Sequence, residues 1–146
     1  MTVKQNDSRL VTLMFAQVLL VKNRPKDEFL SYEPVTEDRI EDEVDEGGDV
    51  ISSVNQDGRH IVIAKFTIAS PANPFLSTLL ARDLATPGGA GFAPLEIIDG
   101  NGTTMFIEPF ARIKGHPKRT FSQKMGDKVL EWKFTCHNPT RFDGGL

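Results

Sequence analysis

The side chains that could do chemistry are concentrated in one acidic segment, residues 27–49. This segment contains eleven Asp or Glu residues and a single base, Arg39. Closely spaced carboxylates are the groups that a hydrolase uses for acid–base chemistry and that calcium prefers as ligands. The segment lacks the alternating oxygen ligands, central glycine and terminal glutamate of an EF-hand loop. It therefore predicts no more than weak, incidental cation binding.

The three histidines and the single cysteine form no pattern that predicts catalysis or metal binding. His60, His116 and His137 are scattered and lack the pairwise spacing of zinc ligands. His60 begins a predicted strand and is expected at the surface or half buried. Cys136 shares one strand face with two aromatic residues, which is typical of a small core residue rather than a nucleophile. We therefore predict that the chain is not an enzyme and holds no cofactor or metal.

A second charged segment, residues 112–133, is basic. Its seven bases stand against two acids, Asp127 and Glu131. The bases are Arg112, Lys114, Lys118, Arg119, Lys124, Lys128 and Lys133. A nucleic-acid groove needs exposed aromatic side chains among its bases, and Phe121 is the only candidate within this cluster. We favour the interpretation that the bases meet the acidic segment of a second copy over the binding of nucleic acid.

Length and composition indicate one globular domain, residues 1–146. The chain is 39% hydrophobic and 25% charged, and its length is ordinary for a single domain. The longest apolar run, residues 18–21, is far short of the roughly 20 residues that cross a bilayer, so no membrane contact is expected. Residues 27–49 carry a net charge of −10 and the rest of the chain carries +7. We therefore expect the acidic segment of one copy to attract the positively charged remainder of another copy.

Apolar periodicity predicts several strands and one helix. Strands are expected at residues 9–15, 18–21 and 29–35, and at 129–136, where inner and outer faces alternate clearly. Hairpins are expected for residues 50–54 with 59–69 and for 95–99 with 103–113. A helix capped by Asn73 should end before Pro87.

Two segments are predicted to lack regular structure: a long acidic loop over residues 37–48 and a flexible tail over residues 139–146. The order of the other elements lacks the regular alternation that builds a parallel sheet. It predicts a mostly β fold, an antiparallel β-sandwich or barrel flanked by one α-helix.

Several motifs carry a resemblance to a known family. They are the S-P-A-N helix start at residues 70–73, the segment 91–106 with its D-G-N-G-T-T hairpin, and the strand E-W-K-F-T-C at residues 131–136. Together they resemble the tail tube proteins of contractile-tailed, myovirus-type bacteriophages. The resemblance covers most of residues 49–138, and it implies the tail-tube fold.

The resemblance implies a structural protein of the virion that forms six-membered rings. Stacked rings make the inner tube of the tail, through which DNA is ejected without specific binding, inside a contracting sheath. The implied partners are other copies, the sheath protein, and tape measure, baseplate and tail terminator proteins. Assembly would take place in the host cytoplasm, and we expect a lumen of net negative charge, because bases would retain the DNA phosphates.

In that family a long loop between early strands reaches a neighbouring ring, and the acidic segment matches its position. The residues expected to make contacts between subunits are therefore charged ones. They are Glu37, Asp38, Glu41, Asp42, Glu43, Asp45, Glu46 and Asp49, with Lys114, Lys118 and Arg119 as candidate receivers.

Two other functions remain open at this point. The tube of a secretion apparatus or tailocin would share the fold and differ only in context. A monomeric β-sandwich that binds a sugar or a small partner belongs to another class, and rings or tubes in micrographs would exclude it. An enzyme ranks last, because no spacing points to a pocket with a perturbed titratable group.

Overall fold

The fold is seen in a computed structural model that describes residues 2–123 and 128–146. A short 3₁₀ turn, η1, precedes the first strand, and the sequence-predicted strands mostly form where expected. The elements are η1 (Ser8–Leu10), β1 (Val11–Phe15), β2 (Val18–Leu19), β3 (Leu30–Pro34), β4 (Ile40–Val44), β5 (Val50–Val54), β6 (His60–Thr67), α1 (Ala72–Ala85), β7 (Ala93–Asp99), β8 (Met105–Ile113), β9 (Val129–Cys136) and β10 (Thr140–Phe142).

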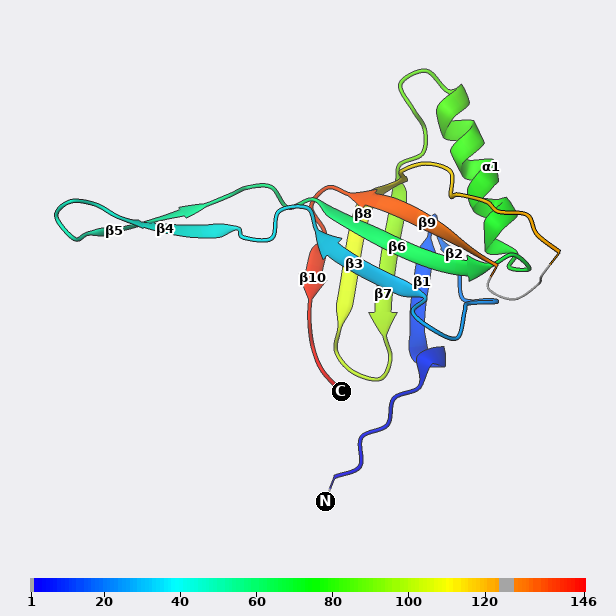
Figure 1. Ribbon diagram of the computed structural model, residues 1–146, viewed down its shortest axis with the longest axis horizontal. Helices are drawn as coiled ribbons and strands as arrows, with labels where there is room; N and C mark the ends of the chain where they lie inside the picture. Colours follow the sequence, from blue (N-terminus) through cyan, green and yellow to red (C-terminus); the bar gives the residue numbers. More distant parts are fainter. Residues whose placement is uncertain (1, 124–127) are drawn as a thin grey trace.

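One antiparallel sheet folds over to make two layers. Its strand order is β2-β1-β7-β8-β9-β6-β3, with β10 paired to β8. In Figure 1 the strands β3, β6 and β9 cross in front of β1, β7 and β8. The mostly β, antiparallel fold with one helix that the sequence predicts is therefore confirmed.

Strand β8 belongs to both layers because it bends in its middle. It pairs with β10 in its first half, with β7 up to Glu108 and again at Ala111, and with β9 only through Arg112 and Ile113. The register with β7 shifts by one residue after Glu108, which is the signature of a bulge. The buried Glu108 carboxylate accepts the Phe110 and Asn138 N–H groups at 2.9 and 3.0 Å. The Glu108 carboxylate thus gives hydrogen-bond acceptors to two backbone N–H groups beside the bend.

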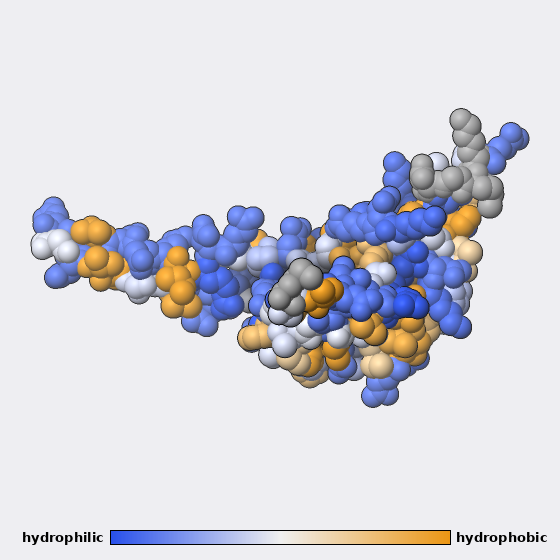
Figure 2. Space-filling view, turned by 90° about the horizontal axis from the view of Figure 1, so that it is seen from below, coloured by the Kyte–Doolittle hydropathy of each residue, from blue (hydrophilic) through white to orange (hydrophobic). Residues whose placement is uncertain are grey.

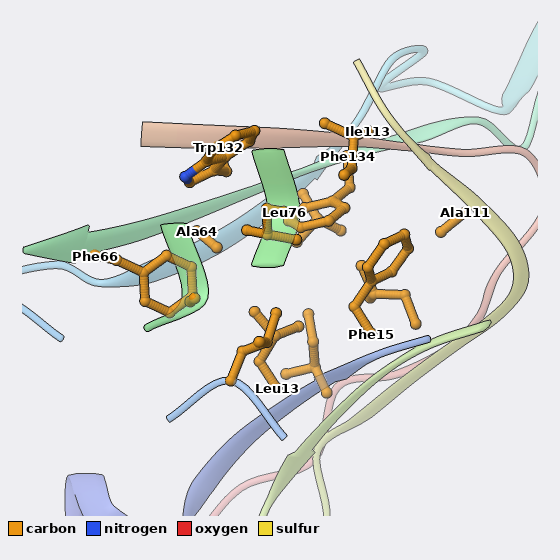
Figure 3. Packing of buried hydrophobic residues seen from close by; sticks show 14 of the residues in the cluster. Leu13, Phe15, Ala64, Phe66, Leu76, Ala111, Ile113, Trp132 and Phe134 are labelled. Carbon is orange, nitrogen blue, oxygen red and sulfur yellow. The ribbon is translucent and has the colours of Figure 1, made fainter. Parts of the chain in front are cut away.

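The core lies between the two layers and beneath the helix. Strand β6 buries every second residue, from His60 to Phe66, and Figure 3 shows Leu76 of α1 among side chains from both layers. Trp132 of β9 is the largest fully buried side chain. His60 is only 8% exposed, so the expectation of a surface or half-buried side chain was wrong, whereas Cys136 is a core residue as predicted.

The helix begins differently from the prediction. It starts at Ala72, whose N–H donates to the Ser70 hydroxyl at 3.2 Å. Asn73 is not its cap. The Asn73 amide points inward, donates to the Thr67 carbonyl at 2.9 Å and accepts the Trp132 indole N–H at 3.1 Å. The Asn73 side chain, which the sequence assigned to the helix cap, therefore serves as the hydrogen-bond acceptor of the buried Trp132 indole.

The end of the acidic segment belongs to a hairpin, residues 40–54, so the predicted long loop over residues 37–48 is wrong. Strand β4 pairs with β5, which was expected to pair with residues 59–69. Strand β6 pairs with β3 and β9 instead. The acids of β4 lie opposite neutral residues: Glu41 faces Ser53 and Asp42 faces Ser52. Since no carboxylate faces another across the ladder, the repulsion that argued against regular structure is avoided.

The carboxy-terminal segment also differs from the expected flexible tail. Residues Thr140–Phe142 form β10 against β8. Beyond it, the Gly144 N–H and carbonyl exchange hydrogen bonds with the Thr104 hydroxyl at 3.1 and 3.2 Å. No helix in the described part of the chain is long and apolar enough to span a membrane.

Candidate functional site

The most distinctive surface is a projecting hairpin, which we call the arm: strands β4 and β5 and the turn between them, residues 40–54. It extends away from the two layers (Figure 1), and every one of its residues is exposed. An isolated two-stranded hairpin is marginally stable in water. The arm therefore has the character of a segment that another surface must support.

The register gives the arm two different faces. On one face Ile40 pairs with Val54 and Val44 pairs with Val50, with Asp42 between them. The opposite face carries Glu41, Glu43, Ser53 and Ile51. Figure 2 shows apolar clusters along the arm among hydrophilic residues. The first face is therefore the more apolar one, and no described part of its own chain covers it.

Hydrogen bonds at the base of the arm fix its direction. The Asn55 N–H donates to the Arg39 carbonyl at 2.7 Å, and the Thr36 hydroxyl donates to Asp57 Oδ2 at 2.7 Å. Asp57 also pairs with Arg59 at 2.8 Å. The Arg59 hydrogen bonds, followed by the Thr36 bond, hold the pKa of Asp57 well below its usual range. The two chain segments that lead into the arm are thus joined before they reach it.

All eight predicted contact carboxylates lie on or beside the arm and are exposed. They occupy the approach to β4 (Glu37, Asp38), β4 itself (Glu41, Asp42, Glu43) and the turn and start of β5 (Asp45, Glu46, Asp49). Asp45 also shapes the turn, since its Oδ1 accepts the Asp49 N–H at 2.9 Å. Within the described residues, none of the eight forms an ion pair with its own chain.

The predicted receivers lie together in a groove of about 780 Å³. Lys114, Lys118 and Arg119 line it, and the structure adds Lys128 and Lys133, with Glu131 as the acid among the described lining residues. Arg119 also lies over the ring of Phe121 at 5.1 Å, so this exposed aromatic is engaged by a base. Lys124 and Asp127 of the basic segment fall outside the described residues.

The arm and the groove lie at opposite ends of the molecule. In Figure 1 the arm extends to the left, whereas residues 115–123 run along the right-hand side near α1. The arm therefore cannot reach the groove of its own chain. A contact between them must join two copies head to tail, which is a heterologous interface.

Arg112 does not belong to the groove, although the sequence grouped it with the other bases. Its guanidinium binds the Asp83 carboxylate in two bonds of 2.7 and 2.9 Å and so ties β8 to α1. The Asp83 side chain is 3% exposed and also accepts the Ala90 N–H at 3.0 Å. The Arg112 hydrogen bonds hold the pKa of Asp83 below its usual 3.8. A base and an acid 29 residues apart thus act in packing.

This pair should make stability depend on pH. We expect Asp83→Asn to lower the free energy of unfolding at pH 7 by about 2 kcal/mol, because it removes charged hydrogen bonds. Since the folded pKa of Asp83 is lowered, its stabilisation is present above pH 3.8 and is lost as the pH falls through the folded pKa. Urea denaturation of both proteins at pH 7 and at lower pH should show the difference shrinking. The exposed Asp42→Asn is the control, and a pH-independent difference would contradict the argument.

His60 and Cys136 are both buried and contribute to packing. His60 Nδ1 lies 2.9 Å from the Gly58 carbonyl and Nε2 lies 3.3 Å from Arg141. Burial, and then Glu108, raise the pKa of the Cys136 thiol to about 12, so the thiol stays protonated at neutral pH. No group of three or more His, Cys, Asp or Glu residues is placed to hold a metal ion in the described part of the chain.

Comparison with known proteins identifies the fold. No family model matches the sequence, and no curated protein does. A chain in the cryo-EM structure of the anti-feeding prophage cap (AFP tube terminating cap) superposes with a TM-score of 0.65 at 9% identity, covering 97% of this chain and 93% of that one. A chain in the structure of an extracellular contractile injection system, PVC sheath/tube terminator in extended state, gives 0.65 at 10% identity, covering 98% and 100%. At these identities the similarity shows the fold alone.

Proposed function

We propose that this chain is a ring-forming structural subunit of the inner tube of a contractile tail or injection assembly. The fold supports the proposal, because chains of similar extent in two contractile-system structures share it. The observation that carries it is the placement of an acidic arm and a basic groove at opposite ends of one chain. Each copy can then give its arm to one neighbour and receive the arm of another.

This polarity favours a tube subunit over a terminating cap. A heterologous contact propagates from copy to copy and closes into rings or continues as a polymer. If the contact joins successive rings, a cap has to stop the propagation and so needs only one of the two surfaces. Because this chain has both, we infer repeated stacking. By the sequence resemblance the rings would be hexameric, enclosed by a sheath and joined to baseplate, tape measure and terminator proteins.

The open edges of the sheet are a second surface through which copies of the subunit can associate. Strands β3 and β2 end the strand order, and among the described strands β3 pairs with β6 alone. Unpaired edges are places where a further strand can add, and closure around a ring removes them. For a phage tail, the lumen so enclosed would pass DNA and should present net negative charge.

Electron microscopy of the purified chain tests the proposal. We expect negative-stain images to show stacked rings or tubes at low salt, and sedimentation to show fewer polymers at 1 M NaCl, where exposed charges are screened. Single rings that never stack would favour a terminator. A strict monomer at high protein concentration would overturn the proposal in favour of a binding module.

A further inference from the structure

We propose that the arm enters the groove of the next copy with its apolar face, Ile40, Val44, Val50 and Val54, turned toward the groove floor. This inference rests on the proposed function and specifies how its two surfaces meet. It assigns the acids and the apolar residues of the arm to different tasks. The acids attract the groove, and the apolar face packs in it.

The groove has a floor and a rim of different chemistry. Ile68, Pro117 and Val129 are half-buried apolar lining residues, and we assign the floor of the groove to them. The exposed lining residues are mostly charged: Lys114, Lys118, Arg119 and Lys133, with Glu131. Long basic side chains around an apolar floor can flank an inserted segment while their aliphatic stems cover its edges.

The arm is complementary to this groove in both respects. Its apolar pairs Ile40–Val54 and Val44–Val50 lie on the same face. The arm is narrow, because its two paired strands are only about 5 Å apart. Once the arm is in the groove, its carboxylates would lie within the Debye length, about 10 Å, of the basic rim, so their attraction to the rim is only partly screened. Turning the other face inward would bury two carboxylates, Glu41 and Glu43, whereas the apolar face carries only Asp42, and burial is costly for unpaired charges. The apolar face is therefore the one to be covered.

Adjacent positions on β5 provide a matched test. Val50 and Ile51 are 66% and 57% exposed, stand at the same point along the arm and point to opposite faces. We expect Val50→Ser to raise the subunit concentration needed for assembly about tenfold, because it removes one buried aliphatic contact. Ile51→Ser should change it less than about twofold. Circular dichroism should show both variants folded, since neither residue belongs to the core.

If Ile51→Ser raised the concentration needed for assembly as much as Val50→Ser or more, the proposed orientation of the arm would be wrong. Tubes formed by the wild-type chain would still support the proposed function. A wild-type chain that forms no polymer would refute both. Cross-linking gives a second readout: Val50→Cys on one copy should form a disulfide with Pro117→Cys on another, and Ile51→Cys should not. The protonated, buried thiol of Cys136 leaves the engineered pair undisturbed. Equal cross-linking of both arm positions would likewise contradict the orientation.

Discussion

Replacing Glu41, Asp42 and Glu43 together by lysine is expected to prevent assembly and leave the chain folded. These side chains are exposed and form no ion pair with the described part of their own chain, so the isolated subunit loses nothing that holds it together. In the assembly all three positions would lie in or beside the basic groove, and like charges at an interface cost several kcal/mol. We therefore expect the concentration required for assembly to rise about a hundredfold or more, measured by sedimentation.

A control of equal charge separates this local effect from net charge. Asp27, Glu28 and Asp143 are also exposed but lie outside the arm and outside the edge strand β3. Their replacement by lysine changes the net charge by the same amount and should disturb assembly far less. If the arm variant instead loses only thermal stability and still forms normal polymers, the contact assigned to the arm is wrong.

The reciprocal exchange tests the groove directly. Lys114→Glu, Lys118→Glu and Arg119→Glu together should prevent assembly in the wild-type background. Mixed with the arm variant, this groove variant offers an acidic receiver to a basic arm, so the mixture should form at least arm-to-groove dimers. Dimers absent from the mixture would show that the two surfaces do not meet.

Trp132→Ala is expected to lower the free energy of unfolding by about 3–5 kcal/mol, the cost of removing a large core side chain. Trp132 is 1% exposed and belongs to the core cluster with Phe66 and Phe134. It also donates its indole N–H to Asn73 Oδ1 at 3.1 Å and so links β9 to the helix. Urea denaturation, monitored by circular dichroism under non-assembling conditions, measures the loss.

Trp132→Phe separates the packing of the ring from the hydrogen bond. It keeps most of the aromatic volume and leaves the buried Asn73 amide oxygen without its donor, which should cost about 1–3 kcal/mol. Adding Asn73→Ala to Trp132→Phe should then cost less than the sum of the single changes, because the partners are coupled. Strict additivity would show that the indole bond contributes nothing.

Much of the fold could be predicted from local pattern. Alternation at period two identified the inner face of residues 129–136, and the D-G-N-G turn identified the hairpin of β7 and β8. The pairing of residues 50–54 could not be predicted in this way. An Asp-Gly turn at Asp57 and Gly58 favoured one partner, whereas the chain pairs β5 with the acidic strand before it. Local turn chemistry was outweighed by the cross-strand apolar pairs and by the competing partners of β6.

For the charged segments, too, the sequence determined one part and the tertiary structure another. By itself the sequence determined that one segment is acidic and another basic, because charge is a property of composition. Only the tertiary structure decided that Arg112 binds Asp83 instead of lining the groove, that Lys128 and Lys133 line the groove beside the predicted receivers, and that the acids lie on a two-faced arm. Periodicity records which side of a segment avoids water, whereas the partner of a side chain depends on which distant segments the folded chain brings within a few ångströms.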